Sequence, residues 1–159
     1  MYKTAKALHF IGLAMFLGSI LGHISLGFLP DAGEAQTVLF GRQAIAVATW
    51  WLTLPGLALL VITGLFMTAR GGHGFGRRRW LTAHQILAVL IVLNAAIVLV
   101  PGGATLLALA AEVADGRRAA DAMQALAGRE SMFGAANLLM ALAAIFVAVM
   151  KPGFGQPRH

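Results

Sequence analysis

Histidines are the residues of this chain whose positions most suggest chemistry. His9, His23 and His84 lie inside long apolar stretches, whereas His73 stands in a glycine-rich segment and His159 is the last residue. An ionisable side chain inside a membrane is costly, so it usually faces the interior of a helix bundle and serves a function. We therefore treat His9, His23 and His84 as candidate ligands and the other two as solvated side chains.

His9 and His84 are predicted to lie at the same depth. Each stands about four residues inside its apolar stretch, which corresponds to roughly 6 Å along a helix. Their two helices run in the same direction in a four-helix arrangement, so both imidazoles reach one layer of the bundle. This is the geometry of two axial ligands on a haem b, whereas a bare metal ion would need a third or fourth donor nearby. The alternative is that both histidines only hydrogen-bond neighbouring helices.

Small and basic residues near these two histidines suit a large planar cofactor. Gly12 and Ala88 each lie about one helical turn from one of the histidines, and small residues let a porphyrin or another helix approach closely. Arg78 and Arg79 directly precede the third apolar stretch, where guanidinium groups are suited to pair with haem propionates. We expect all four residues to contact the cofactor.

His23 suggests a second metal site near the other surface of the membrane. It follows His9 by 14 residues (23 − 9), which is about 21 Å along the helix and returns to nearly the same face. A second haem there would need another ligand, and no second histidine lies near that surface. Met132, Met140 or a second copy of the chain would have to supply it.

The composition is that of a membrane protein. Of the 159 residues, 59% are hydrophobic and 11% are charged, against about a quarter charged in soluble domains. There is no cysteine, which excludes disulfides, thiolate-bound iron, iron–sulfur clusters and c-type haem attachment. The net charge is +6, but the charges flank apolar stretches instead of forming a patch, which argues against nucleic-acid binding.

Four apolar stretches must position the histidines, and each is long enough to cross a bilayer, which takes about 20 residues as a helix. We predict an all-α integral membrane four-helix bundle, one domain over residues 1–151 with a flexible tail over 152–159. The predicted spans are residues 5–29, 44–69, 80–100 and 132–150. Pro55 is expected to kink the second span and Pro101 to end the third. Residues 102–130 are expected to form a short extracytoplasmic connection of two helices, broken at Asp115–Gly116.

Basic residues indicate how the bundle crosses the membrane. All six acidic residues fall on the side that holds the connections after the first and third spans. The other side carries only basic residues, namely Lys3, Lys6, Arg70, Arg77, Arg78, Arg79, Lys151 and Arg158. The positive-inside rule then predicts a multi-pass protein of a bacterial inner membrane with both termini in the cytoplasm.

Three segments resemble those of small membrane proteins of the CopD-like and HemJ-like type. They are "KALHFIGLAMFLGS" in the first span, "TLPGLALLVITGLFM" in the second and "RRWLTAHQILAVLIVL" in the third. The resemblance implies a four-helix membrane fold with a haem held by His9. This chain has Phe16 where those proteins usually have tryptophan, and it lacks the third-span lysine of HemJ-type protoporphyrinogen oxidases. His84 in that span favours ligation by two histidines instead.

These observations predict a membrane b-type haem protein that transfers electrons. One haem b is expected, with a second one left open at His23, and the protein is a possible membrane oxidoreductase. The expected partners are membrane lipids and either a quinol or another redox protein, and a homodimer is an open alternative. The competing functions are copper or small-solute transport and a haem enzyme related to HemJ-type protoporphyrinogen oxidase.

Overall fold

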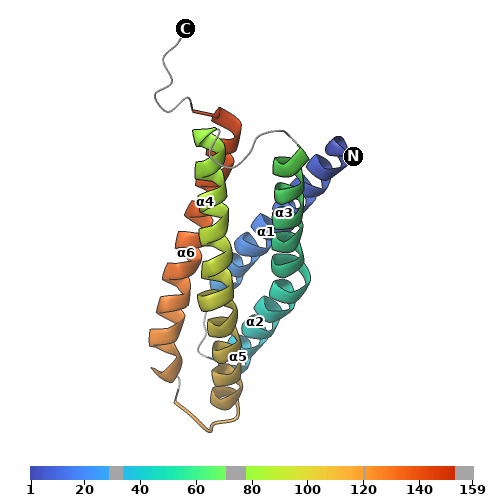
Figure 1. Cartoon of the computed structure of the whole chain (residues 1–159). Helices are drawn as coiled ribbons and strands as arrows, with labels where there is room; N and C mark the ends of the chain where they lie inside the picture. Colours follow the sequence, from blue (N-terminus) through green and yellow to red (C-terminus); the bar gives the residue numbers. More distant parts are fainter. Residues whose placement is uncertain (29–33, 71–77, 120, 153–159) are drawn as a thin grey trace.

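The structure is a computed structural model, and it describes residues 1–28, 34–70, 78–119 and 121–152. The described residues form helices and no strand, and the helices make four long continuous segments, which we call rods. Figure 1 shows how these rods are arranged. The first is α1 (Tyr2–Gly27) and the fourth is α6 (Asp121–Met150). The second joins α2 (Ala35–Ala48), the π-helical turn η1 (Thr49–Thr53) and α3 (Leu54–Arg70). The third joins α4 (Arg79–Asn94), the π-helical turn η2 (Ala95–Leu99) and α5 (Val100–Ala114).

Each rod is long and apolar enough to cross a membrane. The outward faces are apolar as well, because Leu139 and Phe146 on α6 are 66% and 62% exposed. Such side chains are stable on the surface only where lipid surrounds them. The predicted all-α integral membrane bundle is confirmed, and an even number of spans puts both ends of the described chain at one end of the bundle (Figure 1). We call this the terminal end and the opposite one the distal end.

The third rod does not end at Pro101 as predicted. It continues to Ala114, because the π-helical turn η2 precedes the proline and the N–H of Val100 reaches back five residues to the carbonyl of Ala95. Proline has no N–H and cannot make the backbone hydrogen bond of a helix interior, but it is tolerated in the first turn of a helix. The wider π-helical turn makes room for the proline ring, so a new α-helix begins with Pro101 in its first turn.

The second rod uses the same device before Pro55. The π-helical turn η1 ends at Thr53, and the N–H of Leu54 bonds to the carbonyl of Thr49, five residues back. The rod also begins at Ala35, well before the predicted start at residue 44. Arg42 therefore lies within a helix and not in the preceding connection.

The prediction that residues 102–130 form two separate helices between the spans is wrong, whereas the predicted break at Asp115–Gly116 is confirmed. Residues 102–114 are the end of α5 and residues 121–130 are the start of α6. The two are separated at Asp115–Gly116, where Gly116 has a φ of 69° that favours glycine. Of the predicted tail, residues 153–159 lie outside the described residues.

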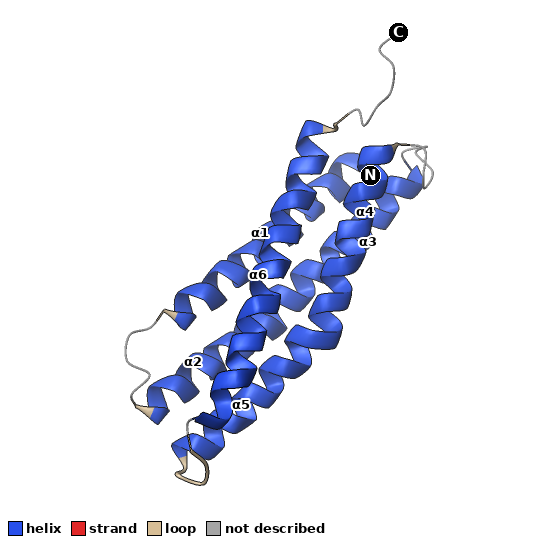
Figure 2. Cartoon of the chain, turned by 90° about the vertical axis from the view of Figure 1, so that its left-hand side faces the viewer, coloured by secondary structure: helices blue, strands red, loops and turns tan. Residues whose placement is uncertain are grey.

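The rods run lengthwise in one helical bundle (Figure 2), and they are joined in pairs that change along it. Near the terminal end α1 packs on α3 and α4 packs on α6, while α3 and α4 make few contacts with each other. At mid-depth the two pairs meet in a core of Phe16, Ile20, Ile91 and Ala141. Toward the distal end α2 packs on α5 around a second core of Leu106, Ala110 and Met123. The terminal half thus consists of two helix pairs that face each other.

The closest approach within a pair is between α1 and α3. A Cβ atom added to Gly12 would lie 2.9 Å from the carbonyl oxygen of Gly56, and one added to Gly56 would lie 2.9 Å from that of Gly12. Two glycines at the crossing let the two backbones touch, which is how small residues bring membrane helices together. This contact holds α1 against α3 just below the layer of His9.

Candidate functional site

His9 is held by α3, the partner helix in its own pair. Its Nδ1 atom lies 2.9 Å from the hydroxyl oxygen of Thr63, which is 5% exposed. The Thr63 hydroxyl itself donates to the backbone carbonyls of Leu59 and Leu60, so it has no proton left for the imidazole. His9 Nδ1 must therefore donate to Thr63. With the proton assigned to Nδ1, the Nε2 atom of the neutral ring has a lone pair.

His84 is held in the same way by α6, the partner helix of α4. Its Nδ1 atom lies 3.0 Å from the backbone carbonyl oxygen of Ala144, which is buried. A carbonyl only accepts, so His84 Nδ1 carries the proton and its Nε2 atom also keeps a lone pair. Both imidazoles thus carry their proton on Nδ1, and in this tautomer the lone pair of Nε2 can coordinate a metal ion.

The structure brings the two histidines together across the space between the helix pairs. They lie close enough for their rings to interact electrostatically. Each ring is tied to its own pair, His9 to α3 and His84 to α6, so neither uses its Nδ1 atom to bond the other. Two imidazoles that are oriented by neighbouring helices therefore lie within electrostatic reach of each other near the terminal end.

Gln85 is a polar residue of this layer that the sequence analysis did not single out. Its Nε2 atom donates to the hydroxyl of Thr68 over 3.3 Å and joins α4 to α3. Its Oε1 atom is buried and has no hydrogen-bond partner. The signal in the sequence was an amide beside His84 in an otherwise apolar stretch, a position where an unpaired acceptor is costly.

The other residues predicted around the cofactor fall into two groups. Ala88 is half-buried and shares the inward face of α4 with the buried Ile91. Gly12 instead lies against α3 at the crossing with Gly56, so its small size is explained by helix packing. Its predicted contact with a cofactor stays a prediction.

The basic residues at the terminal end are where the sequence places them. Arg78 precedes the first turn of α4, Arg79 is the first residue of that helix, and both are exposed. Lys151 lies 5.7 Å from the ring centroid of Trp80, which ties the end of α6 to the start of α4. Their predicted pairing with propionates stays a prediction.

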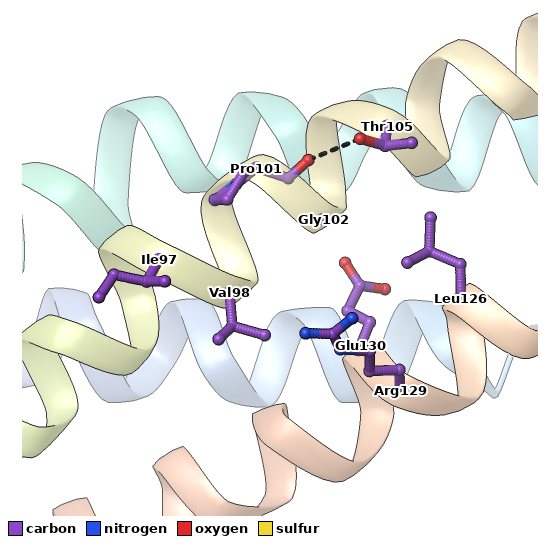
Figure 3. A pocket seen from close by; sticks show the side chains of 8 residues that line it. All are labelled: Ile97, Val98, Pro101, Gly102, Thr105, Leu126, Arg129 and Glu130. Atoms are coloured by element: carbon purple, nitrogen blue, oxygen red, sulfur yellow. Dashed lines mark hydrogen bonds between the residues drawn. The ribbon is translucent and has the colours of Figure 1, made fainter.

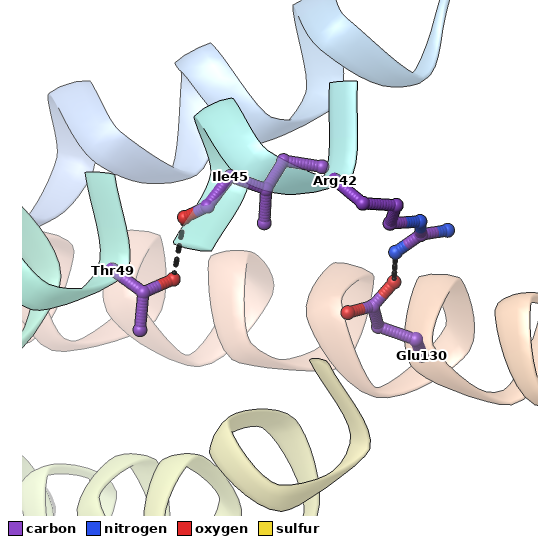
Figure 4. A network of polar contacts seen from close by, with 4 residues as sticks. All are labelled: Arg42, Ile45, Thr49 and Glu130. Atoms are coloured by element: carbon purple, nitrogen blue, oxygen red, sulfur yellow. Dashed lines mark hydrogen bonds and ion pairs between the residues drawn. The ribbon is translucent and has the colours of Figure 1, made fainter. Parts of the chain in front are cut away.

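His23 lies at the distal end among polar groups of its own helix and of neighbouring helices. Its Nε2 atom is 3.4 Å from the hydroxyl of Ser19, which also bonds to the hydroxyl of Thr53, and its ring bonds to the backbone of Ile45. An ion pair between Arg42 and Glu130 stands close by, joining α2 to α6 (Figure 4). These partners account for an imidazole at this position.

A second metal site at His23 stays a prediction. The described residues contain no group of three or more His, Cys, Asp or Glu side chains that could hold a metal ion. Met132 is 62% exposed on α6, and Met140 packs against the core around Phe16.

The comparisons with known proteins concern the chain as a whole. Residues 3–152 match the family model DUF2269, described as a predicted integral membrane protein. No curated protein and no solved structure matches the chain. The match agrees with the membrane fold that the CopD-like and HemJ-like resemblance implies, while that resemblance itself stays a prediction. Because the match covers nearly the whole chain, this protein belongs to the DUF2269 family of integral membrane proteins.

Proposed function

We propose that this protein binds one haem b in the membrane, with the Nε2 atoms of His9 and His84 as its two axial ligands. The observation that carries the proposal is that each Nδ1 atom donates to an acceptor on the partner helix, Thr63 or Ala144. Metal-ligating histidines almost always donate their other ring N–H in this way, which fixes the tautomer and the ring orientation. Two histidines at one depth share this arrangement, which simple helix packing does not require.

The number of ligands favours a haem over a bare metal ion. A structural or transported metal ion usually needs three or four protein donors. The part of the chain that the structure describes offers no such cluster. A porphyrin brings four nitrogens of its own, so two imidazoles complete its coordination. The described residues therefore support a site for a bare metal ion built from His, Cys, Asp or Glu less well than haem binding.

The residues around the ligands would hold and shield the cofactor. Thr63 and Ala144 keep the imidazoles oriented, and the core around Phe16 and Ile91 closes the layer toward the middle of the membrane. A haem with two imidazole ligands has no open position, so it supplies one-electron transfer instead of oxygen activation. A quinol or another redox protein is the partner that such a function calls for.

The orientation in the membrane is part of the proposal. Among the described residues, the terminal end carries Lys3, Lys6, Arg70, Arg78, Arg79 and Lys151 and no acidic side chain. By the positive-inside rule this end faces the cytoplasm of a bacterium, which puts the haem near the cytoplasmic surface.

Absorption spectra of the detergent-purified protein, oxidised and then reduced with dithionite, test the proposal. We expect a sharp α-band in the reduced wild-type protein and its loss, or a high-spin spectrum, in both His9→Ala and His84→Ala. His23→Ala is the matched control, because it removes a histidine of the same helix from the other end of the bundle, and its spectrum should be unchanged.

Two outcomes contradict the proposal. One is a wild-type preparation that stays colourless after haem is added to the folded protein. The other is an unchanged low-spin spectrum in either His9→Ala or His84→Ala. A wild-type haem that binds carbon monoxide readily would point instead to a displaceable ligand and to the enzyme alternative.

A further inference from the structure

A pocket at the distal end combines apolar walls with a carboxylate (Figure 3). It lies between the η2–α5 segment and the first turns of α6, and its volume is about 180 Å³. Its walls include Ile97, Val98, Pro101 and Leu126, and Arg129 and Glu130 supply its charged groups. Because an apolar cavity of about 150 Å³ holds a benzene molecule, this pocket has room for one six-membered ring with small substituents.

Glu130 directs its carboxylate from α6 toward α5. One oxygen, Oε2, accepts from the guanidinium of Arg42, whose side chain is 17% exposed against 21% for Glu130. The other oxygen, Oε1, lies beside Gly103, where an added Cβ atom would be 3.4 Å from it. Since Gly103 has no side chain, α5 leaves Oε1 room to accept a further hydrogen bond.

The chemistry of the walls selects a neutral ligand with a hydrogen-bond donor. The Glu130 carboxylate disfavours an anion close to it, and the Arg129 guanidinium in the wall disfavours a cation. Pro101 has no N–H, so it offers the pocket no backbone donor. Ile97 is 68% exposed on the apolar outer surface, so the pocket opens toward lipid.

From these features we propose that the distal pocket binds the head group of a membrane-soluble quinol. A quinol is an uncharged ring of the right size, it dissolves in lipid, and it carries hydroxyl donors. One hydroxyl donates to the Oε1 atom of Glu130, and the ring packs between Val98 and Leu126. Arg42 holds the carboxylate in place for this contact.

This site is separate from the proposed haem site. Pro101 follows His84 by 17 residues (101 − 84), which is about 25 Å along the continuous helix. Quinol binding therefore does not rest on haem binding, and it is measured on a His9→Ala/His84→Ala protein that lacks the proposed ligands. Failure of one proposal then leaves the other standing.

The test measures binding of radiolabelled decylubiquinol, kept reduced without oxygen, to the full chain in lipid nanodiscs. We expect saturable binding and competition by the unlabelled quinol. The dimethyl ether of the same quinol has the same ring and no hydroxyl donor, so it should compete about tenfold less well or worse, as the loss of a hydrogen bond to a charged group predicts.

Two variants place the binding in the pocket. Leu126→Trp fills the pocket and should abolish saturable binding, whereas Leu139→Trp puts the same side chain on the lipid face of α6, where Leu139 is 66% exposed, and should not. Glu130→Gln should weaken binding by about tenfold, and circular dichroism checks that this variant is folded. Unsaturable binding, equal competition by the ether, or unchanged binding in Leu126→Trp overturns the proposal.

Discussion

Thr63 offers the sharpest test of how the haem ligands are held. In Thr63→Val the hydroxyl that accepts the Nδ1–H of His9 is replaced by a methyl group of nearly the same size. Thr63 is 5% exposed and the bond is 2.9 Å long, so water does not replace the lost hydroxyl, and the backbone of Leu60 is left as an acceptor for the His9 ring. Leaving a buried N–H without a partner costs about 1–3 kcal/mol, and the loss of an outer partner lowers metal affinity by about 10- to 100-fold.

These magnitudes agree with each other, since tenfold in affinity corresponds to about 1.4 kcal/mol. We expect Thr63→Val to lose haem to apomyoglobin about 10- to 100-fold faster than the wild type, while its reduced spectrum stays low-spin. Thr63→Ser keeps the hydroxyl and should behave like the wild type. Thr105→Val is the matched control, because the Thr105 hydroxyl donates only within its own helix, to the carbonyl of Pro101, at the distal end.

The result that would refute the reasoning is equal haem loss in Thr63→Val and the wild type. It would mean that the His9 ring is oriented by something other than Thr63, or that His9 is not a ligand. The spectrum of His9→Ala separates these two explanations.

Three further predictions concern the fold. Gly12→Val should lower the midpoint of thermal unfolding markedly, because the new Cβ atom would lie 2.9 Å from backbone and side-chain atoms of α3. Gly18→Val is the control and should not lower it, because the space around Gly18 is open. Equal midpoints in the two variants would contradict the close crossing. Arg42→Ala should destabilise the protein by about 1–3 kcal/mol in denaturant unfolding, because it leaves the Glu130 carboxylate without its partner. Adding Glu130→Gln removes that charge and should recover part of the loss. No recovery would show that the two residues do not act as a pair. Asn137 on α6 is 2% exposed, and its Oδ1 atom accepts a hydrogen bond from the Asn94 amide on α4. Asn137→Leu should still cost only about 0.6 kcal/mol of unfolding free energy, since hydrogen bonds between membrane helices contribute little on average. A loss of several kcal/mol would contradict this.

Much of the fold could be predicted because it depends on local properties. Apolar length alone identifies the spans, since a membrane admits only segments that satisfy their own backbone hydrogen bonds. The break at Asp115–Gly116 was predicted from a glycine, and Gly116 has the positive φ that glycine tolerates. Pro101 was misread because the rule for proline assumes a regular α-helix, and the π-helical turn before it depends on residues that carry no simple pattern.

The candidate site divides in the same way. The common depth of His9 and His84 follows from the sequence, because helical rise converts residue number into position along the membrane axis. Their hydrogen-bond partners do not, since Thr63 and Ala144 are 54 and 60 residues away in the chain. No pattern in a single span indicates which acceptor a neighbouring helix will present to an imidazole.

By itself, then, the sequence determined that this protein is a helical membrane bundle with two imidazoles in one layer. The tertiary structure decided that α1 pairs with α3 and α4 with α6, that each imidazole finds an acceptor for its Nδ1–H on the partner helix, and that Arg42 meets Glu130 across 88 residues of chain. The physical reason is that span and depth are sums over neighbouring residues. Pairing depends on which faces fit together, as the two glycines do where α1 crosses α3, and that complementarity exists only between segments.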